Sequence, residues 1–89
     1  MPQVNVDPEE VKRFAAELKA FNEQLRELTS RLQASSKRLA EKWLDQEHEK
    51  FAREFDTTKK SLDQFIRNAD QHVSYLQKKA ERLDGYFSR

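Results

Sequence analysis

Residues that interrupt helices are almost missing from this chain, and no other feature constrains its fold as strongly. The 89 residues include one glycine and two prolines, and 37% of them are charged. An all-β fold needs turn residues about every 8 to 12 positions, which this sequence cannot supply. Long helices are therefore expected, and a chain of this length should form a single domain with one core.

A repeat of apolar residues at alternating steps of three and four extends through the first half of the chain. Asp7 and Pro8 precede it and suit the N-cap and the first position of a helix. Such spacing is the a/d repeat of a helix that packs along its whole length. The members are Val11, Phe14, Leu18, Phe21, Leu25, Leu28, Leu32, Ser35 and Leu39. The repeat predicts a tail and cap at residues 1–7 and a helix over residues 8–42.

A second repeat with the same spacing begins at His48 and continues to Tyr86. Gly85 follows Asp84 and offers a glycine C-cap, so we predict a turn at residues 43–46, a helix over residues 47–84 and a tail at residues 85–89. A short connection between two long helices makes them antiparallel. The predicted fold class is therefore all-α, with an antiparallel helical hairpin over residues 1–89.

The large apolar residues of the two repeats are the predicted core of the hairpin. Facing residues should have numbers that sum to about 90, with most apolar burial in the middle and near the turn. The open end, which contains His72 and Lys79, should pack more loosely. The predicted core comprises Phe14, Leu18, Phe21, Leu25, Leu28, Leu32, Leu39, Phe51, Phe55, Leu62, Phe65 and Leu76.

A hairpin alone buries one stripe on each helix, which is too little apolar surface to offset the entropy of ordering so long a structure. In the second predicted helix, several positions that follow the repeat are also apolar, which gives a face wide enough to contact two neighbours. We therefore expect two hairpins to form a four-helix bundle, most simply as a two-fold dimer. Ile66, Val73 and Phe87 are the expected contacts with the second chain.

The triplet Trp43-Leu44-Asp45 lies at the expected bend and contains the only tryptophan of the chain. The indole of Trp43 can close the end of the bundle by packing against Leu39 and Phe51. Asp45 can accept backbone N–H groups as the N-cap of the second helix. These roles are structural and require no ligand.

Catalytic, cofactor-binding and metal sites are not expected. The chain has no cysteine, and His48 and His72 lie too far apart along one helix to share a metal ion. With 17 basic and 16 acidic residues, the balanced charge gives no reason to expect nucleic acid as a partner. No apolar run reaches the roughly 18 to 20 residues of a membrane helix, and the N-terminus lacks the pattern of a secretory signal peptide.

These features resemble the WXG family, which comprises small helical-hairpin proteins of type VII (ESX-type) secretion similar to early secreted antigenic targets. The resemblance rests on the opening Val6-Asp7-Pro8-Glu9-Glu10, on Trp43 at the bend, and on Phe51 and Phe55 after it. The chain departs from the family at two points. Asp45 replaces the glycine of the motif, and the Tyr-x-x-x-Asp/Glu export signal is not matched, because Lys79 follows Tyr75.

The resemblance implies a non-enzymatic secreted substrate, or a partner and carrier protein, of a type VII-like system. Such a protein pairs with itself or with a related helical hairpin, and can accompany a larger helical toxin or effector. It would be secreted without a classical signal peptide, and cytoplasmic before export. One alternative is a structural hairpin subunit of another secretion apparatus or of a filament. Another is a nucleic-acid or lipid-headgroup binder that uses Lys78, Lys79 and Arg82.

Overall fold

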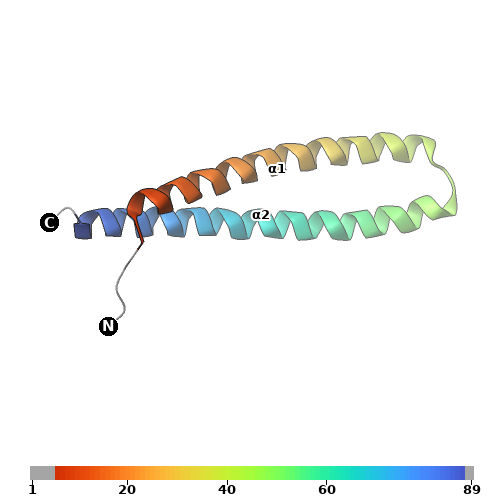
Figure 1. Ribbon diagram of the computed structural model, residues 1–89. Helices are drawn as coiled ribbons and strands as arrows, with labels where there is room; N and C mark the ends of the chain where they lie inside the picture. The colour runs from red at the N-terminus through yellow and green to blue at the C-terminus, as the bar shows by residue number, and fades with distance from the viewer. Residues whose placement is uncertain (1–5, 88–89) are drawn as a thin grey trace.

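Two long helices form an antiparallel hairpin in the computed structural model, which describes residues 6–87 (Figure 1). Helix α1 spans Pro8–Lys42 and helix α2 spans Gln46–Phe87. The molecule measures 67 × 24 × 14 Å, so the hairpin is a single layer of two helices. No strand occurs among the described residues, and the predicted all-α hairpin is confirmed.

The helix ends follow from local side chains, with one exception. Asp7 accepts a hydrogen bond of 3.0 Å from the backbone N–H of Glu9 and caps α1, which covers the residues expected from the sequence. The predicted end of the second helix at residue 84 is wrong, because α2 continues through Gly85 to Phe87. Gly85 does not adopt the positive φ of a glycine C-cap and remains helical.

Alanines, aliphatic side chains and one asparagine, rather than aromatic rings, make the contact between α1 and α2. We call this contact the seam. Its buried members recur at steps of three, four and seven, but on α1 most are displaced by one position from the large residues of the predicted repeat. They are Val11, Ala15 and Asn22 on α1, and Ile66, Ala69, Val73, Ala80 and Leu83 on α2.

The predicted hairpin core is therefore wrong for its largest members. Their exposed fractions lie between 37% and 56%: Phe14, Phe21, Leu28, Leu32, Leu39, Phe51 and Phe65. The other members are half-buried: Leu18, Leu25, Phe55, Leu62 and Leu76. Two helices approach closely where the side chains that face each other are small. The large residues next to these positions in the sequence then point to one side of the helix pair.

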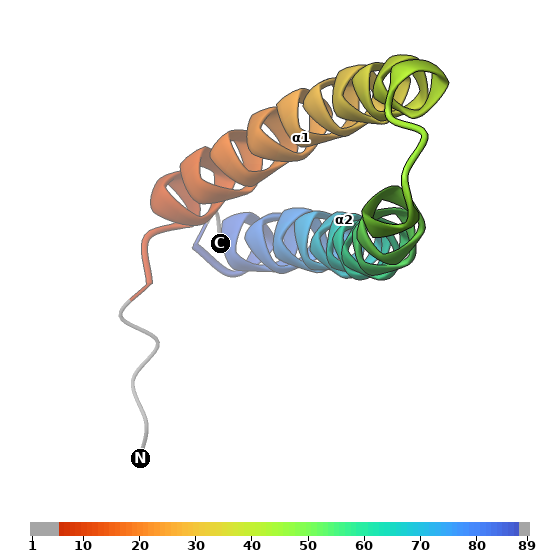
Figure 2. The ribbon, with the colours of Figure 1, turned by 90° about the vertical axis from the view of Figure 1, so that its right-hand side faces the viewer.

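Burial is concentrated at the open end of the hairpin, not near the turn as expected. Every buried residue lies within residues 11–22 or 66–83. Figures 1 and 2 show α1 and α2 diverging toward the bend, where the chain is yellow and green. Small residues such as Ala15, Ala69 and Ala80 allow close approach at the open end, whereas aromatic side chains occupy the bend.

Candidate functional site

The exposed large residues of the two repeats form one apolar surface. Phe21 on α1 and Phe65 on α2 meet across the seam, with ring centroids 6.3 Å apart in an edge-to-face arrangement. Residues seven positions apart lie on nearly the same side of a helix, so Phe14 and Leu28 share the side of Phe21. We call this surface the apolar face and define it as Phe14, Phe21, Leu28, Leu32, Leu39, Phe51 and Phe65.

A groove of about 550 Å³ indents the apolar face at the open end. Phe14 and Phe65 belong to both the face and the groove, so the two are continuous. The lining is mainly apolar and includes three polar side chains, all from α2. It consists of Phe14, Leu18, Phe65, Asn68, Ala69, His72, Tyr75 and Leu76. A groove of this composition suits an apolar side chain from another molecule.

Charged residues join the two helices on a different side from the apolar face. Lys12 pairs with Asp84, and Arg26 pairs with Asp70. The hydrogen bond from Arg26, together with one from Asn22, holds the pKa of Asp70 below its ordinary value. The hydrogen bonds that Lys12 donates to Asp84 and Glu9 raise the pKa of Lys12. These pairs stabilise the charged forms and favour one alignment of α1 against α2.

Asn22 places a polar group in the seam, at the end of its buried part nearest the bend. Its side chain has 0% exposure and donates hydrogen bonds to Asp70 Oδ1 at 3.1 Å and to the carbonyl oxygen of Ile66 at 3.5 Å. Its own Oδ1 atom is buried and has no hydrogen-bond partner among the described residues. A single buried amide in an apolar seam favours the register in which its donors are satisfied.

Three aromatic rings follow one another at the bend. Trp43 lies 5.6 Å from Phe51, and Phe51 lies 5.8 Å from Phe55, measured between ring centroids. The predicted contact of Trp43 with Phe51 is confirmed, and His48 adds an edge-to-face contact with Trp43 at 5.4 Å.

The other two residues of the turn motif have different surroundings. Asp45 accepts a hydrogen bond from the backbone N–H of His48 at 3.2 Å, which confirms its role as the cap of α2. Leu44 is 85% exposed at the tip. No described residue has a positive φ, so the turn forms without the backbone freedom of a glycine at position 45.

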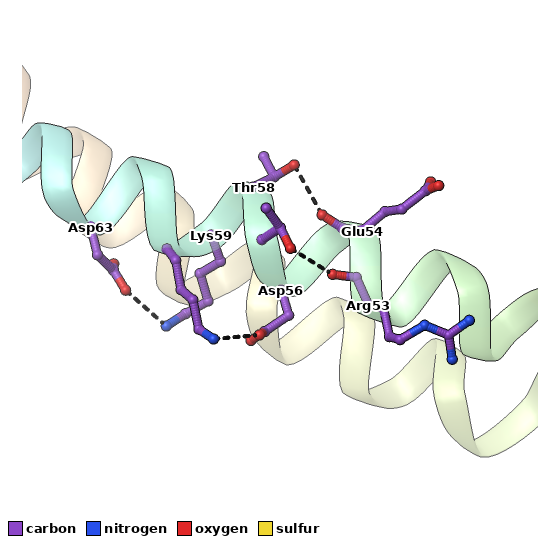
Figure 3. Close-up of polar contacts among 8 residues, drawn as sticks. Arg53, Glu54, Asp56, Thr58, Lys59 and Asp63 are labelled. Carbon is purple, nitrogen blue, oxygen red and sulfur yellow. Dashed lines mark hydrogen bonds and ion pairs between the residues drawn. The ribbon is translucent and has the colours of Figure 1, made fainter.

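Polar side chains on α2 near the bend bond within their own helix (Figure 3). Lys59 pairs with Asp63, and the hydroxyl of Thr58 donates to the carbonyl oxygen of Glu54 at 3.1 Å. The ion pair of Lys60 with Asp56 is also local. Local pairing of this kind fits the divergence of the two helices in this part of the hairpin.

Two of the three residues expected to contact a second chain do not lie on the apolar face. Ile66 and Val73 are 5% and 7% exposed because they pack in the seam against α1, so the expectation that they anchor a contact between chains is wrong. The side chain of Phe87 lies outside the described part of the structure. The residues that form the apolar face are instead ones that the sequence predicted for the hairpin core. The small residues Ala15, Asn22, Thr29 and Ser36, each one position after a large or repeat residue, were the signal for the true seam.

Features of metal-binding and membrane-spanning proteins are absent from residues 6–87. No group of three or more His, Cys, Asp or Glu side chains in this range is arranged to hold a metal ion. Neither of the two described helices has a stretch apolar enough to cross a membrane.

Comparison with known proteins gives one match. A family model, WXG100, described as proteins of 100 residues with WXG, matches residues 3–85, which is nearly the whole chain. No curated protein and no solved structure matches the chain.

Proposed function

This chain belongs to the WXG100 family of small helical, secretion-associated proteins, and from that premise we propose that it works by docking its apolar face onto a second helical hairpin. In this proposal it is a non-enzymatic substrate, or a carrier of another substrate, in a type VII-like secretion system. The exposure of the apolar face carries the proposal, because its side chains remain 37% to 56% exposed in the single hairpin.

The size of the apolar face supports a stable contact. Its phenylalanine and leucine side chains are about half exposed, which corresponds to an apolar area on the order of 700 Å². Exposed apolar patches on monomeric proteins seldom exceed about 300 to 600 Å², and a standard interface buries about 800 Å² on each partner. A second layer of two helices would cover the face and complete a four-helix bundle.

A second copy of this chain is the partner that we propose. The net charge of +1 opposes self-association only weakly. Charges beside the apolar face on α1 are mainly acidic near the open end, where Glu10 and Glu17 flank Arg13, and basic toward the bend, at Arg31 and Lys42. A second copy in the reversed orientation would bring acidic residues near basic ones. A related hairpin with similar features would bind the same face.

The proposed role in secretion rests on family membership and on one departure from the family pattern. Lys79 occupies the position, four residues after Tyr75, at which the export signal would require an acidic residue. We infer that any export of this chain depends on a signal carried by a bound partner. A pairing surface is what such a carrier needs.

Glutamate substitutions on the apolar face test this function. Phe21→Glu combined with Leu28→Glu should halve the mass measured by light scattering, because two charges would be buried in the interface. Ala16→Glu combined with Ser30→Glu is the matched control, since it adds the same charge at exposed positions of α1 away from the face. The control should keep the mass of the dimer. A double variant that remains helical by circular dichroism and keeps that mass would exclude the apolar face.

The mass measured by light scattering also distinguishes a dimer from the alternative, a subunit of a filament. A hairpin that pairs through one face forms a closed species of constant mass, whereas head-to-tail assembly grows as concentration rises.

A further inference from the structure

The groove at the open end of the apolar face contains an ionisable side chain. His72 lines the groove together with Phe14, Leu18, Phe65 and Leu76. Resting on the function proposed above, we infer that this groove anchors the second copy through an apolar side chain, and that the imidazole of His72 makes the anchor sensitive to acid.

The position of the groove explains why it would serve as the anchor. It lies at the open end, where the buried residues of the seam hold α1 and α2 together, so the two helices that line it are already in place before a partner arrives. Helix α1 contributes Phe14 and Leu18, and α2 contributes the remaining lining residues. An apolar side chain that enters this groove would be surrounded by both helices, which is the arrangement typical of a residue that dominates binding energy.

The lining of the groove contains no carboxylate beside His72. The only other titratable side chain in the lining is Tyr75, and a tyrosine phenol is uncharged near neutral pH. Asp70 is engaged with Arg26 at the other side of the seam. Other charged residues near the lining are not part of it, and they include Glu10, Arg13, Glu17 and Lys19 on α1, and Arg67, Lys78 and Lys79 on α2.

His72 is exposed in the single hairpin and would lose water when the groove is filled. Burial disfavours the charged imidazolium, so the free hairpin would bind more protons than the docked one. Docking should therefore be strongest at a pH above the ordinary histidine pKa of about 6.5. It should weaken as the pH falls through that pKa. The association constant of the dimer should fall about tenfold per pH unit below that value for each buried His72, and a two-fold dimer buries two.

The test is the dissociation constant of the full chain, measured by sedimentation at pH 7.5 and at pH 5.5. We expect the unmodified dimer to dissociate on the order of a hundredfold more readily at pH 5.5. His72→Leu should remove most of this dependence. His48→Leu is the matched control, because His48 contacts Trp43 at the bend and lies outside the groove, and this variant should retain the dependence.

The outcomes distinguish this inference from the proposed function. A dimer whose dissociation constant does not change with pH, or changes equally with and without His72, would overturn the role of the groove and leave the docking face intact. A chain that stays monomeric at every pH would contradict both. Circular dichroism at each pH separates loss of pairing from loss of helix.

Discussion

Single polar residues select how the two helices align. Asn22 donates to Asp70, and Arg26 pairs with the same carboxylate, so one acidic side chain on α2 joins two residues of α1. Displacing α2 by one turn would leave the buried amide of Asn22 without its acceptor, at a cost of about 1 to 3 kcal/mol. Small apolar side chains in the seam do not distinguish registers so strongly. The sequence placed Asn22 beside the predicted repeat but did not indicate that it would be buried, because its burial depends on the rotation of α1.

Asp70→Asn should lower stability at neutral pH more than in acid. The pKa of Asp70 is depressed in the folded chain, so its contribution is present above the pKa of the unfolded chain and is lost as the pH falls through the folded value. Urea unfolding at pH 7 and pH 3 should show a difference from the unmodified chain at pH 7 that shrinks below about pH 4. Asp56→Asn, which removes only a local pair with Lys60, is the control. An equal effect of Asp70→Asn at both pH values would refute this role.

At the scale of the helix, the sequence predicted which segments are helical much better than which side of each helix is buried. Length, caps and the scarcity of breakers determine the helices, and these are local properties. The seam depends on how closely two helices approach, which is not a local property. Large and small residues stand side by side along α1, as at Phe14 and Ala15 or Phe21 and Asn22. The predicted core contains the larger residue of each pair, whereas the structure buries the smaller one and exposes the larger one.

Asp45 is a helix cap, and the glycine of the family motif should be tolerated in its place. Asp45→Ala should reduce the free energy of unfolding by about 1 kcal/mol, because the N–H of His48 would lose its side-chain acceptor. Asp45→Gly should cost only a few tenths of a kcal/mol, since glycine is itself an acceptable N-cap. Thermal or urea unfolding can resolve this order. A glycine variant less stable than the alanine variant would show that capping is not the function of this position.

Gly85 lies inside α2, so alanine should stabilise the end of the helix. A Cβ atom at position 85 meets nothing within 4 Å, and the backbone is already helical. Gly85→Ala should therefore raise stability by about 0.5 to 1 kcal/mol. A loss of stability in urea unfolding would instead indicate that Gly85 ends the helix in solution, as its sequence context suggested.

For the whole molecule, a single layer of two helices has no interior that could cover large side chains from both sides. A thickness of 14 Å leaves one side of the hairpin apolar and the residues Phe14, Phe21 and Phe65 in contact with water. The proposal of a second chain follows from the amount of apolar surface that the sequence carries. Its location could not, because the residues expected to bind the partner, Ile66 and Val73, pack in the seam.

The mass of the unmodified chain in solution tests the central claim, that a second copy covers the apolar face. Sedimentation equilibrium at pH 7.5 should give about twice the chain mass of 10.6 kDa at micromolar concentrations, with dissociation only on strong dilution. A mass of 10.6 kDa at every concentration, with the helices intact by circular dichroism, would contradict pairing with a second copy.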